Sequence, residues 1–456
     1  MNVDSINIKA IKATNLRVDA SYHLSEGQEV KRIINSCPYE MLTIKDVSSD
    51  IFIGGRAKRV YVTKKEHGIP FLSSSDILQA DLENVKLASK KYTPNLEQMK
   101  LKKGWTLITR SGTIGNCAFA NAKHAQKLAS EHVIRVNPNN ILRQGLIYAY
   151  LTSKYGHSLL TQGTFGAVIQ HIEPAFVGSL PIPNFPESFQ VEVDNLIQES
   201  AVLREKSADF LNKAVTTFDN VIGNPNFCFE STNERISISQ ITNRFYRFDA
   251  QYQIAKERLT SQIHETVNST IKLKELATKI FIGNRGKRLY VKEQGIPFLS
   301  SSDMMLFNAI FYAKKISKKT PCLKEMIVSY GDILISRSGT VGNTIIVGNS
   351  YNGTAVSEHA MRLVIDKHKI EPEYIFAYLQ SMHGQSVLKS LPYGSVIITL
   401  GETYLGDIDI PIINKDLKFS IISDVRQYIS SLDKAIELEN RAISMVEAEI
   451  EKWNKH

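Results

Sequence analysis

The sequence has few cysteines and no long hydrophobic run, and both absences exclude classes of protein. The four cysteines lie far apart, without a CxxC pair or a nearby histidine cluster, at Cys37, Cys117, Cys228 and Cys322. Their scatter argues against a zinc site and a disulfide framework and favours reduced thiols. No run of about 18 apolar residues exists, and the first residues lack the apolar core of a signal peptide. We therefore expect no membrane span and a cytoplasmic location.

Motifs of several enzyme classes are missing as well. The chain has no GxxxxGK[ST] loop for ATP and no glycine-rich signature for S-adenosylmethionine. It lacks an NPPY-type tetrapeptide of adenine methylation, to which NPNF at Asn224 is only superficially similar, and a convincing nuclease cluster. We interpret the chain as a binding protein that has no catalytic residues, no metal site and no cofactor of its own.

The composition permits a large globular protein with a polyanionic partner. With 456 residues, 43% of them hydrophobic, the chain can bury two or three cores. A charged fraction of 22% is ordinary and argues against gross disorder. The formal net charge of +9 favours a nucleic acid or an acidic membrane as partner.

The clearest positive feature is an internal repeat. The stretch IFIGGRAKRVYV from Ile51 returns as IFIGNRGKRLYV from Ile280, and GIPFLSSSD from Gly68 returns unchanged from Gly295. The motif TRSGTIGN returns as SRSGTVGN, and the SEH motif that follows it returns unchanged, each 227 residues further along the chain. A repeat of this length is a domain rather than a solenoid unit. The chain therefore contains two tandem copies of one domain.

A long helical pattern follows each copy. In the last segment, isoleucines recur every seven residues, at Ile422, Ile429, Ile436, Ile443 and Ile450, which predicts a coiled-coil seam. A looser stripe over about 187–222 includes Leu196, Leu203 and Phe210. Because neither stripe can stay in water, we expect the two helices to pack on each other, antiparallel if the domains are equivalent. The alternative is that each helix pairs with another subunit.

Within each copy the patterns are mixed. Short strand-like runs flank the RSGT and SEH motifs, at 106–109, 132–136, 333–336 and 360–365. Residues 145–160 and 374–390 have amphipathic helix patterns. The fold class is therefore α+β. It comprises two pseudo-symmetric mixed α/β domains, residues 1–184 and 223–414, separated by two long helices, 185–222 and 415–456, that form an antiparallel coiled coil.

The two RSGTxGN loops are the first candidate binding surface. Their glycines allow positive φ and close approach of a partner, while hydroxyls and main-chain amides suit phosphate oxygens. An arginine suits phosphate or guanine. Alternatively, the loop is a tight turn whose polar side chains bond to their own backbone, and for Ser111 and Thr113 both interpretations stay open. The candidates are Arg110, Ser111, Thr113, Asn116, Arg337, Ser338, Thr340 and Asn343.

A second candidate surface is basic. Three cations precede an aromatic residue in each copy, Tyr61 or Tyr290, which fits a surface that follows a nucleic-acid backbone. The alternative is a solvated charged turn. Serines of the SSSD motifs could contact base edges, whereas Asp76 and Asp303 are expected to cap helices that start after them. The Glu-His pairs of SEH are expected to be structural. The candidates here are Lys58, Arg59, Ser74, Lys287, Arg288 and Ser301.

Taken together, these features resemble the specificity subunits of type I restriction-modification systems. The resemblance rests on GDILISRSGTVGN and WTLITRSGTIGN, each followed by SEH and a long helix, and covers the chain from about Arg17 onward. It implies two target recognition domains, each reading half of a bipartite site in double-stranded DNA. The helices would set the spacer and dock two methyltransferase subunits, joined by restriction subunits. S-adenosylmethionine, ATP and Mg²⁺ would be bound by those partners.

The similarity of the copies adds an expectation of its own. We expect two related half-sites arranged partly as an inverted repeat, with differences carried by the divergent segments 77–86, 117–129 and 165–171 and by 304–313, 344–356 and 393–399. Three alternatives stay open. They are a specificity subunit of a methylation-only or type II-like system, a coiled-coil adaptor that binds proteins, and an unrecognised enzyme.

Overall fold

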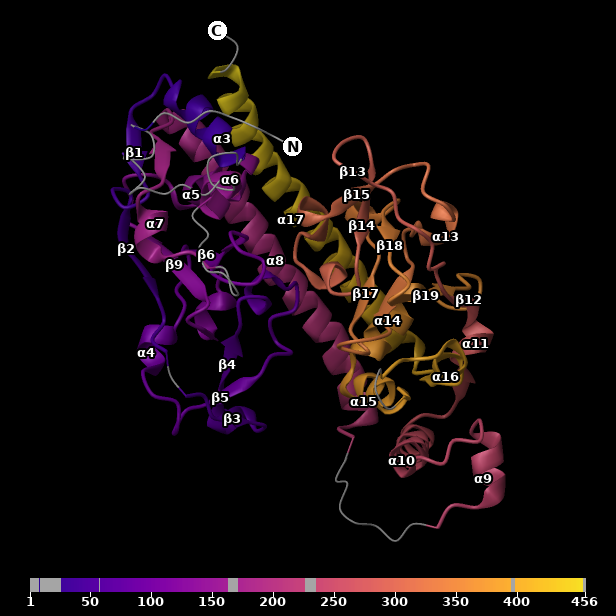
Figure 1. Cartoon of the computed structure of the whole chain (residues 1–456). Coiled ribbons are helices and arrows are strands. Elements are labelled where there is room, and N and C mark those ends of the chain that lie inside the picture. The colour runs from indigo at the N-terminus through magenta and orange to yellow at the C-terminus, as the bar shows by residue number, and fades with distance from the viewer. Residues whose placement is uncertain are drawn as a thin grey trace. The chain divides into compact units, whose positions relative to one another are not determined.

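The computed structural model describes residues 8, 26–56, 58–162, 171–225, 235–394 and 398–453 (Figure 1). Arg17, Cys228 and most of the 165–171 segment lie outside these residues. The chain forms two compact units: unit 1 is Met1–Glu205 with Lys434–His456, and unit 2 is Lys206–Asp433. The divisions fall inside the two long helices, α8 (Glu187–Ile222) and α17 (Lys415–Trp453), so each unit contains part of both.

The described residues of unit 1 form three sheets. One has the order β2-β9-β6-β7, all antiparallel, from β2 (Ser48–Ile53), β9 (Val133–Pro138), β6 (Thr106–Thr109) and β7 (Cys117–Phe119). A second has the order β3-β5-β4-β8, from β3 (Tyr61–Val62), β5 (Leu87–Ser89), β4 (Gly68–Leu72) and β8 (Leu128–Ala129). The third pairs β1 (Met41–Thr43) with β10 (Pro181–Pro183). The helices are α3 (Glu26–Asn35), α4 (Leu96–Met99), α5 (Gln144–Thr152), α6 (Lys154–Gln162) and α7 (Pro174–Gly178).

Unit 2 repeats this topology. Its sheets have the orders β12-β19-β16-β17, β13-β15-β14-β18 and β11-β20. The strands are β11 (Thr270–Lys272), β12 (Ala277–Ile282), β13 (Tyr290–Val291), β14 (Ile296–Leu299), β15 (Lys314–Ile316), β16 (Ile333–Ser336), β17 (Thr344–Ile346), β18 (Ala355–Val356), β19 (Ala360–Ile365) and β20 (Asp409–Pro411). The helices are α9 (Ile238–Asn243), α10 (Ala250–Thr266), α11 (Leu273–Leu276), α12 (Ala309–Tyr312), α13 (Leu323–Met326), α14 (Pro372–Gln380), α15 (Met382–Ser390) and α16 (Glu402–Gly406). The matching orders confirm the duplicated α+β fold.

The prediction of one continuous amphipathic helix at 145–160 and another at 374–390 is wrong in two respects. Each is interrupted, at Ser153 and at Ser381, where ψ is 158° and 161°. The Ser381 hydroxyl donates to the Tyr378 carbonyl at 2.6 Å and accepts from the Gly384 amide at 3.1 Å, so it ends α14 and starts α15. In addition, α14 is buried almost all round rather than along one face. The same holds for α5.

The long helices pack on each other inside each unit, as expected. In unit 1 the Ser200 hydroxyl donates to the Ala435 carbonyl at 2.8 Å, and Arg441 lies 3.6 Å from Glu192, so the helices run antiparallel. In unit 2, Lys213 and Asp424 form an ion pair at 2.9 Å. The isoleucines of the seam, Ile422, Ile429, Ile436, Ile443 and Ile450, are all at most 5% exposed.

The buried stripe of α17 is wider than a coiled-coil seam. Ile421, Leu438 and Ala442 are also buried, although they lie outside the seven-residue repeat. The helices pack on their units as well as on each other, which requires a broader apolar face. On α8, Leu196 is buried, whereas Leu203 and Phe210 are only partly so, which fits the looser stripe of that helix.

Replacing Ile436 with Asp tests this packing. Ile436 is 3% exposed, so the variant buries an unpaired carboxylate and loses apolar contacts. We expect a loss of about 3–5 kcal/mol in the free energy of unfolding, measured by urea titration with circular dichroism. Lys434→Asp, at an exposed position of the same helix, is the control and should lose less than about 1 kcal/mol. Equal losses in the two variants would show that Ile436 does not pack in the seam.

Candidate nucleic-acid interface

The RSGTxGN segments form the loops between β6 and β7 and between β16 and β17. All four glycines have positive φ: 80° at Gly112, 84° at Gly115, 76° at Gly339 and 94° at Gly342. A Cβ added at Gly112 or Gly339 would meet nothing within 4 Å, so both loop tips are open to solvent. A partner can therefore approach the backbone here closely, as the sequence suggested.

The base of the unit 1 loop is held by a threonine. The Thr109 hydroxyl donates to the Thr113 carbonyl and accepts from the Asn116 amide at 3.0 Å. The Thr109 amide donates to the Asn116 carbonyl at 2.9 Å. These bonds use backbone groups and leave the Thr113 side chain exposed and that of Asn116 partly exposed. Thr340 and Asn343 have the same exposure in unit 2.

A serine–histidine pair lies at the edge of each loop. The Ser111 hydroxyl is 2.9 Å from His132 Nδ1, and the Ser338 hydroxyl is 2.8 Å from His359 Nδ1. The histidine side chains are 43% and 47% exposed. The Glu-His motif by itself predicts only a structural pair, because its serine partner comes from a distant segment of the sequence. The pair offers hydrogen-bonding groups to a ligand at the loop.

The glutamates of the two SEH motifs form ion pairs with arginines of the basic patch, which is the group of cations that precedes Tyr61 or Tyr290. Glu131 is buried and ion-paired with Arg59, and Glu358 is buried and ion-paired with Arg288. Burial raises the pKa of Glu131, but its own backbone amide and Arg59 outweigh this, and the pKa is lowered. The Arg59 guanidinium also lies 4.8 Å from the centroid of the Phe71 ring. Arg59 and Arg288 are thus fixed by the fold beside the loops.

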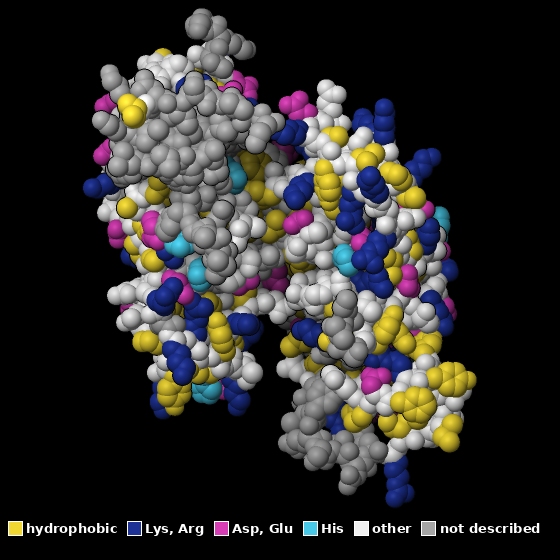
Figure 2. Space-filling model, in the orientation of Figure 1, with side chains coloured by type: hydrophobic (Ala, Val, Ile, Leu, Met, Phe, Trp, Pro, Cys, Tyr) yellow, Lys and Arg dark blue, Asp and Glu magenta, His cyan; other side chains and the backbone are white. Residues whose placement is uncertain are grey.

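Other cations of the patch are exposed. Lys58 and Lys287 project into solvent, as do Tyr61 and Tyr290 on β3 and β13. The Lys86 ammonium lies 5.2 Å from the centroid of the Tyr61 ring. Figure 2 shows Lys and Arg side chains gathered around hydrophobic ones over β3 and β5 of unit 1 and over β13 and β15 of unit 2. This alternation of cations and aromatics suits a nucleic-acid backbone.

The SSSD motifs form short turns. The Ser73 amide donates to Asp76 Oδ2 at 2.8 Å, and the Ser300 amide donates to Asp303 Oδ2 at 3.0 Å. The aspartates are therefore structural, but the expectation that they cap helices starting after them is wrong: each 3-10 helix begins at the aspartate, and its N-cap is Ser75 or Ser302. Ser74 and Ser301, the candidates for base contact, are partly exposed at these turns.

Two buried arginines, Arg135 and Arg362, were not among the predicted functional residues. Arg135 donates to the carbonyls of Ser130 at 3.0 Å and Val133 at 2.6 Å, and it supports the SEH segment from beneath. Burial lowers its pKa to about 10. Arg362, the equivalent residue in unit 2, donates to the Ile327 carbonyl at 2.6 Å. Their equal spacing in the repeat was a signal that could have revealed them.

Arg110 and Arg337 reach across to the segments that precede α7 and α16. The Nε of Arg110 donates to the Ile172 carbonyl at 3.1 Å, and that of Arg337 donates to the Leu400 carbonyl at 3.2 Å. Arg110 is also ion-paired with Glu173. In each unit the structure thus gathers the RSGT loop, SEH and the basic patch on the sheets.

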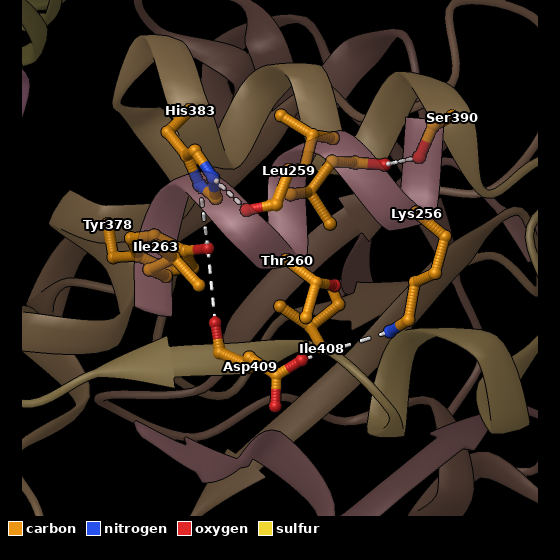
Figure 3. A pocket seen from close by; sticks show the side chains of 10 residues that line it. Lys256, Leu259, Thr260, Ile263, Tyr378, His383, Ser390, Ile408 and Asp409 are labelled. Atoms are coloured by element: carbon orange, nitrogen blue, oxygen red, sulfur yellow. Dashed lines mark hydrogen bonds and ion pairs between the residues drawn. The ribbon is translucent and has the colours of Figure 1, made fainter. Parts of the chain in front are cut away.

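A small cavity in unit 2 does not form a second site (Figure 3). Its volume is about 20 Å³, enough for a single water molecule. His383 points into it, with Nε2 3.0 Å from the Leu259 carbonyl and Nδ1 3.1 Å from the Tyr378 hydroxyl (Figure 3). Burial lowers the pKa of His383. The repeat places Tyr155 at this position in unit 1, so the histidine is not shared.

Two further findings concern the part of the chain that the structure describes. It contains no group of three or more His, Cys, Asp or Glu side chains arranged to hold a metal ion. Nor does it contain a helix long and apolar enough to span a bilayer.

Comparison with known proteins gives one domain match. Residues 38–191 match the family model of the type I restriction modification DNA specificity domain. No curated protein matches the sequence. The domain match falls in the first copy of the repeat and includes its RSGT loop, SEH and basic patch.

Several solved structures are similar to this chain, with low sequence identities and low TM-scores. They include the S subunit of a type I restriction-modification system from M. genitalium, the HsdS subunit from Thermoanaerobacter tengcongensis, and a structure titled for complex assembly and conformational transition of the type I R-M system. The identities are 14%, 14% and 13%, and the TM-scores are 0.33, 0.28 and 0.29. The matches cover 92%, 91% and 92% of this chain and 96%, 96% and 97% of theirs.

The ion pair of Arg59 predicts a stability effect. Arg59→Ala leaves the buried Glu131 carboxylate without its guanidinium, which we expect to lower the free energy of unfolding by about 2–3 kcal/mol. Lys58→Ala, at the exposed neighbouring position, should change it by less than about 0.5 kcal/mol. Urea denaturation of both variants is the measurement. A stable Arg59→Ala variant would show that Arg59 is not part of the framework.

Proposed function

We propose that the chain is a member of the type I restriction-modification DNA specificity family and that each of its units binds one half of a bipartite site in double-stranded DNA. The family match covers residues 38–191 of unit 1. Unit 2 repeats the same motifs and the same sheet orders. One chain thus carries two copies of a DNA-reading domain, which is what a site with two halves requires.

The observation that carries this proposal is the repeated surface. In both units an open glycine loop, a half-exposed histidine, an exposed lysine and an exposed tyrosine lie on one pair of sheets. Lysines and loop amides suit phosphates, which fix the register of a protein on the duplex. Side chains at the loops, such as Ser111 and Ser338, would then contact base edges. A surface duplicated in this detail argues for the same ligand twice.

We propose that the chain acts in the cytoplasm without turnover of its own. Two methyltransferase subunits, one for each unit, would carry S-adenosylmethionine, and restriction subunits would carry ATP and Mg²⁺. The missing ATP and S-adenosylmethionine motifs in the sequence are consistent with this division of labour. The similarity of the two units also favours related half-sites in a partly inverted repeat, because pseudo-twofold domains meet the duplex in opposite orientations.

Methylation mapping tests this function. Co-expression with a methyltransferase subunit encoded beside it, followed by methylation-sensitive sequencing of host DNA, should reveal one gapped motif. We expect a methylated adenine in each half and halves that are related by inversion.

Each other outcome is informative. Unrelated halves would contradict the inverted-repeat proposal alone. A stable complex without any modified motif would contradict the specificity function and favour a protein-binding adaptor. Methylation without cleavage of unmodified DNA by the full complex would indicate a methylation-only system.

A further inference from the structure

Arg110 and Arg337 occupy equivalent positions and share one geometry. Each follows the last residue of a central strand, β6 or β16, and donates from Nε to a carbonyl of the segment beside the loop. That segment returns the contact, since the Ile172 amide donates to the Arg110 carbonyl at 3.3 Å and the Leu400 amide donates to the Arg337 carbonyl at 3.0 Å. The two arginines are therefore held in the same way by the backbone.

The residue after Ile172 or Leu400 gives the two arginines different surroundings. In unit 1 it is Glu173, whose carboxylate forms an ion pair with Arg110 and lies 3.6 Å from His171 Nε2. The Arg110 side chain is only 12% exposed. In unit 2 the equivalent residue is Gly401, and within the described ranges of the chain no carboxylate forms an ion pair with Arg337.

The acidic residue of unit 2 lies one position further on. Glu402 is the first residue of α16 and lines a cavity of about 340 Å³ together with Lys274 and Lys279. In unit 1 this position is Pro174, the first residue of α7. The exchange of Glu-Pro for Gly-Glu thus moves a negative charge away from the arginine of the loop and toward two lysines.

We propose that Glu173 neutralises Arg110, so that the loop of unit 2 provides one more unpaired cation for DNA than the loop of unit 1. This inference rests on the proposed function. A carboxylate and a phosphate compete for the same guanidinium N–H groups. Arg337 therefore contacts the DNA, whereas Arg110 positions its loop by fastening it to the start of α7. The two halves of the site are bound with unequal electrostatic attraction, although the sequence motifs are the same.

The salt dependence of DNA affinity tests the inference. The full chain is titrated with a random-sequence duplex of about 40 bp between 50 and 200 mM salt, because each phosphate contact contributes about 0.9 to the slope of log affinity against log salt. Arg337→Ala should lower the slope by about 0.9, equivalent to a change of three- to fourfold over this range. Arg337→Lys, which keeps the charge, should leave it unchanged. Arg110→Ala should alter it by less than about 0.3.

The matched variant in unit 1 releases the arginine. Glu173→Gln keeps a hydrogen-bonding side chain but removes the negative charge, so it should raise the slope by about 0.9. The double variant Glu173→Gln with Arg110→Ala should return to the wild-type slope, because the effect acts through Arg110. A slope that stays high in the double variant would mean that the glutamate repels DNA by itself, and would overturn the inference.

The remaining outcomes separate the two proposals. If Arg110→Ala and Arg337→Ala lower the slope equally, or neither lowers it, the inference is wrong while the DNA-binding function stands. If the wild-type chain shows no salt-dependent affinity for the duplex, the proposed function itself fails. Should Arg110→Ala fail to fold, Glu173→Gln and the two Arg337 variants still decide between the outcomes.

Discussion

The rest of the structure depends on the burial of both long helices against one nearly fully buried helix in each unit. In unit 1 the Gly145 amide of α5 donates to Asp194 of α8 at 2.7 Å, and Tyr148 donates to Glu439 of α17 at 2.6 Å. In unit 2, Phe376 of α14 stacks on Tyr428 of α17 at 5.8 Å. Because α5 and α14 are buried on nearly every side, they depend on such neighbours to keep them from water.

The binding surface inherits its geometry from this arrangement. Helix α5 packs on β6 and β7, and α14 packs on β17, so the strands that carry the RSGT loops rest on the buried helices. In unit 1 the carbonyl contacts of Arg135 fix the segment that holds His132, whereas Arg362 of unit 2 donates to the carbonyls of Ile327 and Glu325. Polar side chains can then be presented on open loops without losing their positions, which is what recognition of a rigid duplex needs.

The sequence predicted what is periodic or repeated, and missed what joins distant segments. Seven-residue spacing and a duplicated motif report burial and topology directly, so the long helices and the paired domains could be found. The pairs of Arg59 with Glu131 and Arg110 with Glu173 connect residues more than 60 positions apart, and no local pattern encodes them. The breaks at Ser153 and Ser381 were not predicted because hydrophobic periodicity continues through them. The serine hydrogen bonds that end the helices produce no periodic pattern in the sequence.

The position of the unit boundaries determines the order in which the chain can fold during synthesis. Unit 2 is a continuous stretch, Lys206–Asp433, whereas unit 1 needs Lys434–His456, which the ribosome makes only after unit 2. Domains of most multidomain proteins fold from the N-terminus onward. Here unit 1 begins to emerge before unit 2 but completes its fold after it. Its apolar helix α5 lacks its contacts with α17 until more than 200 further residues have been translated. Of the two units, the one made first is therefore more exposed to aggregation and proteolysis during synthesis.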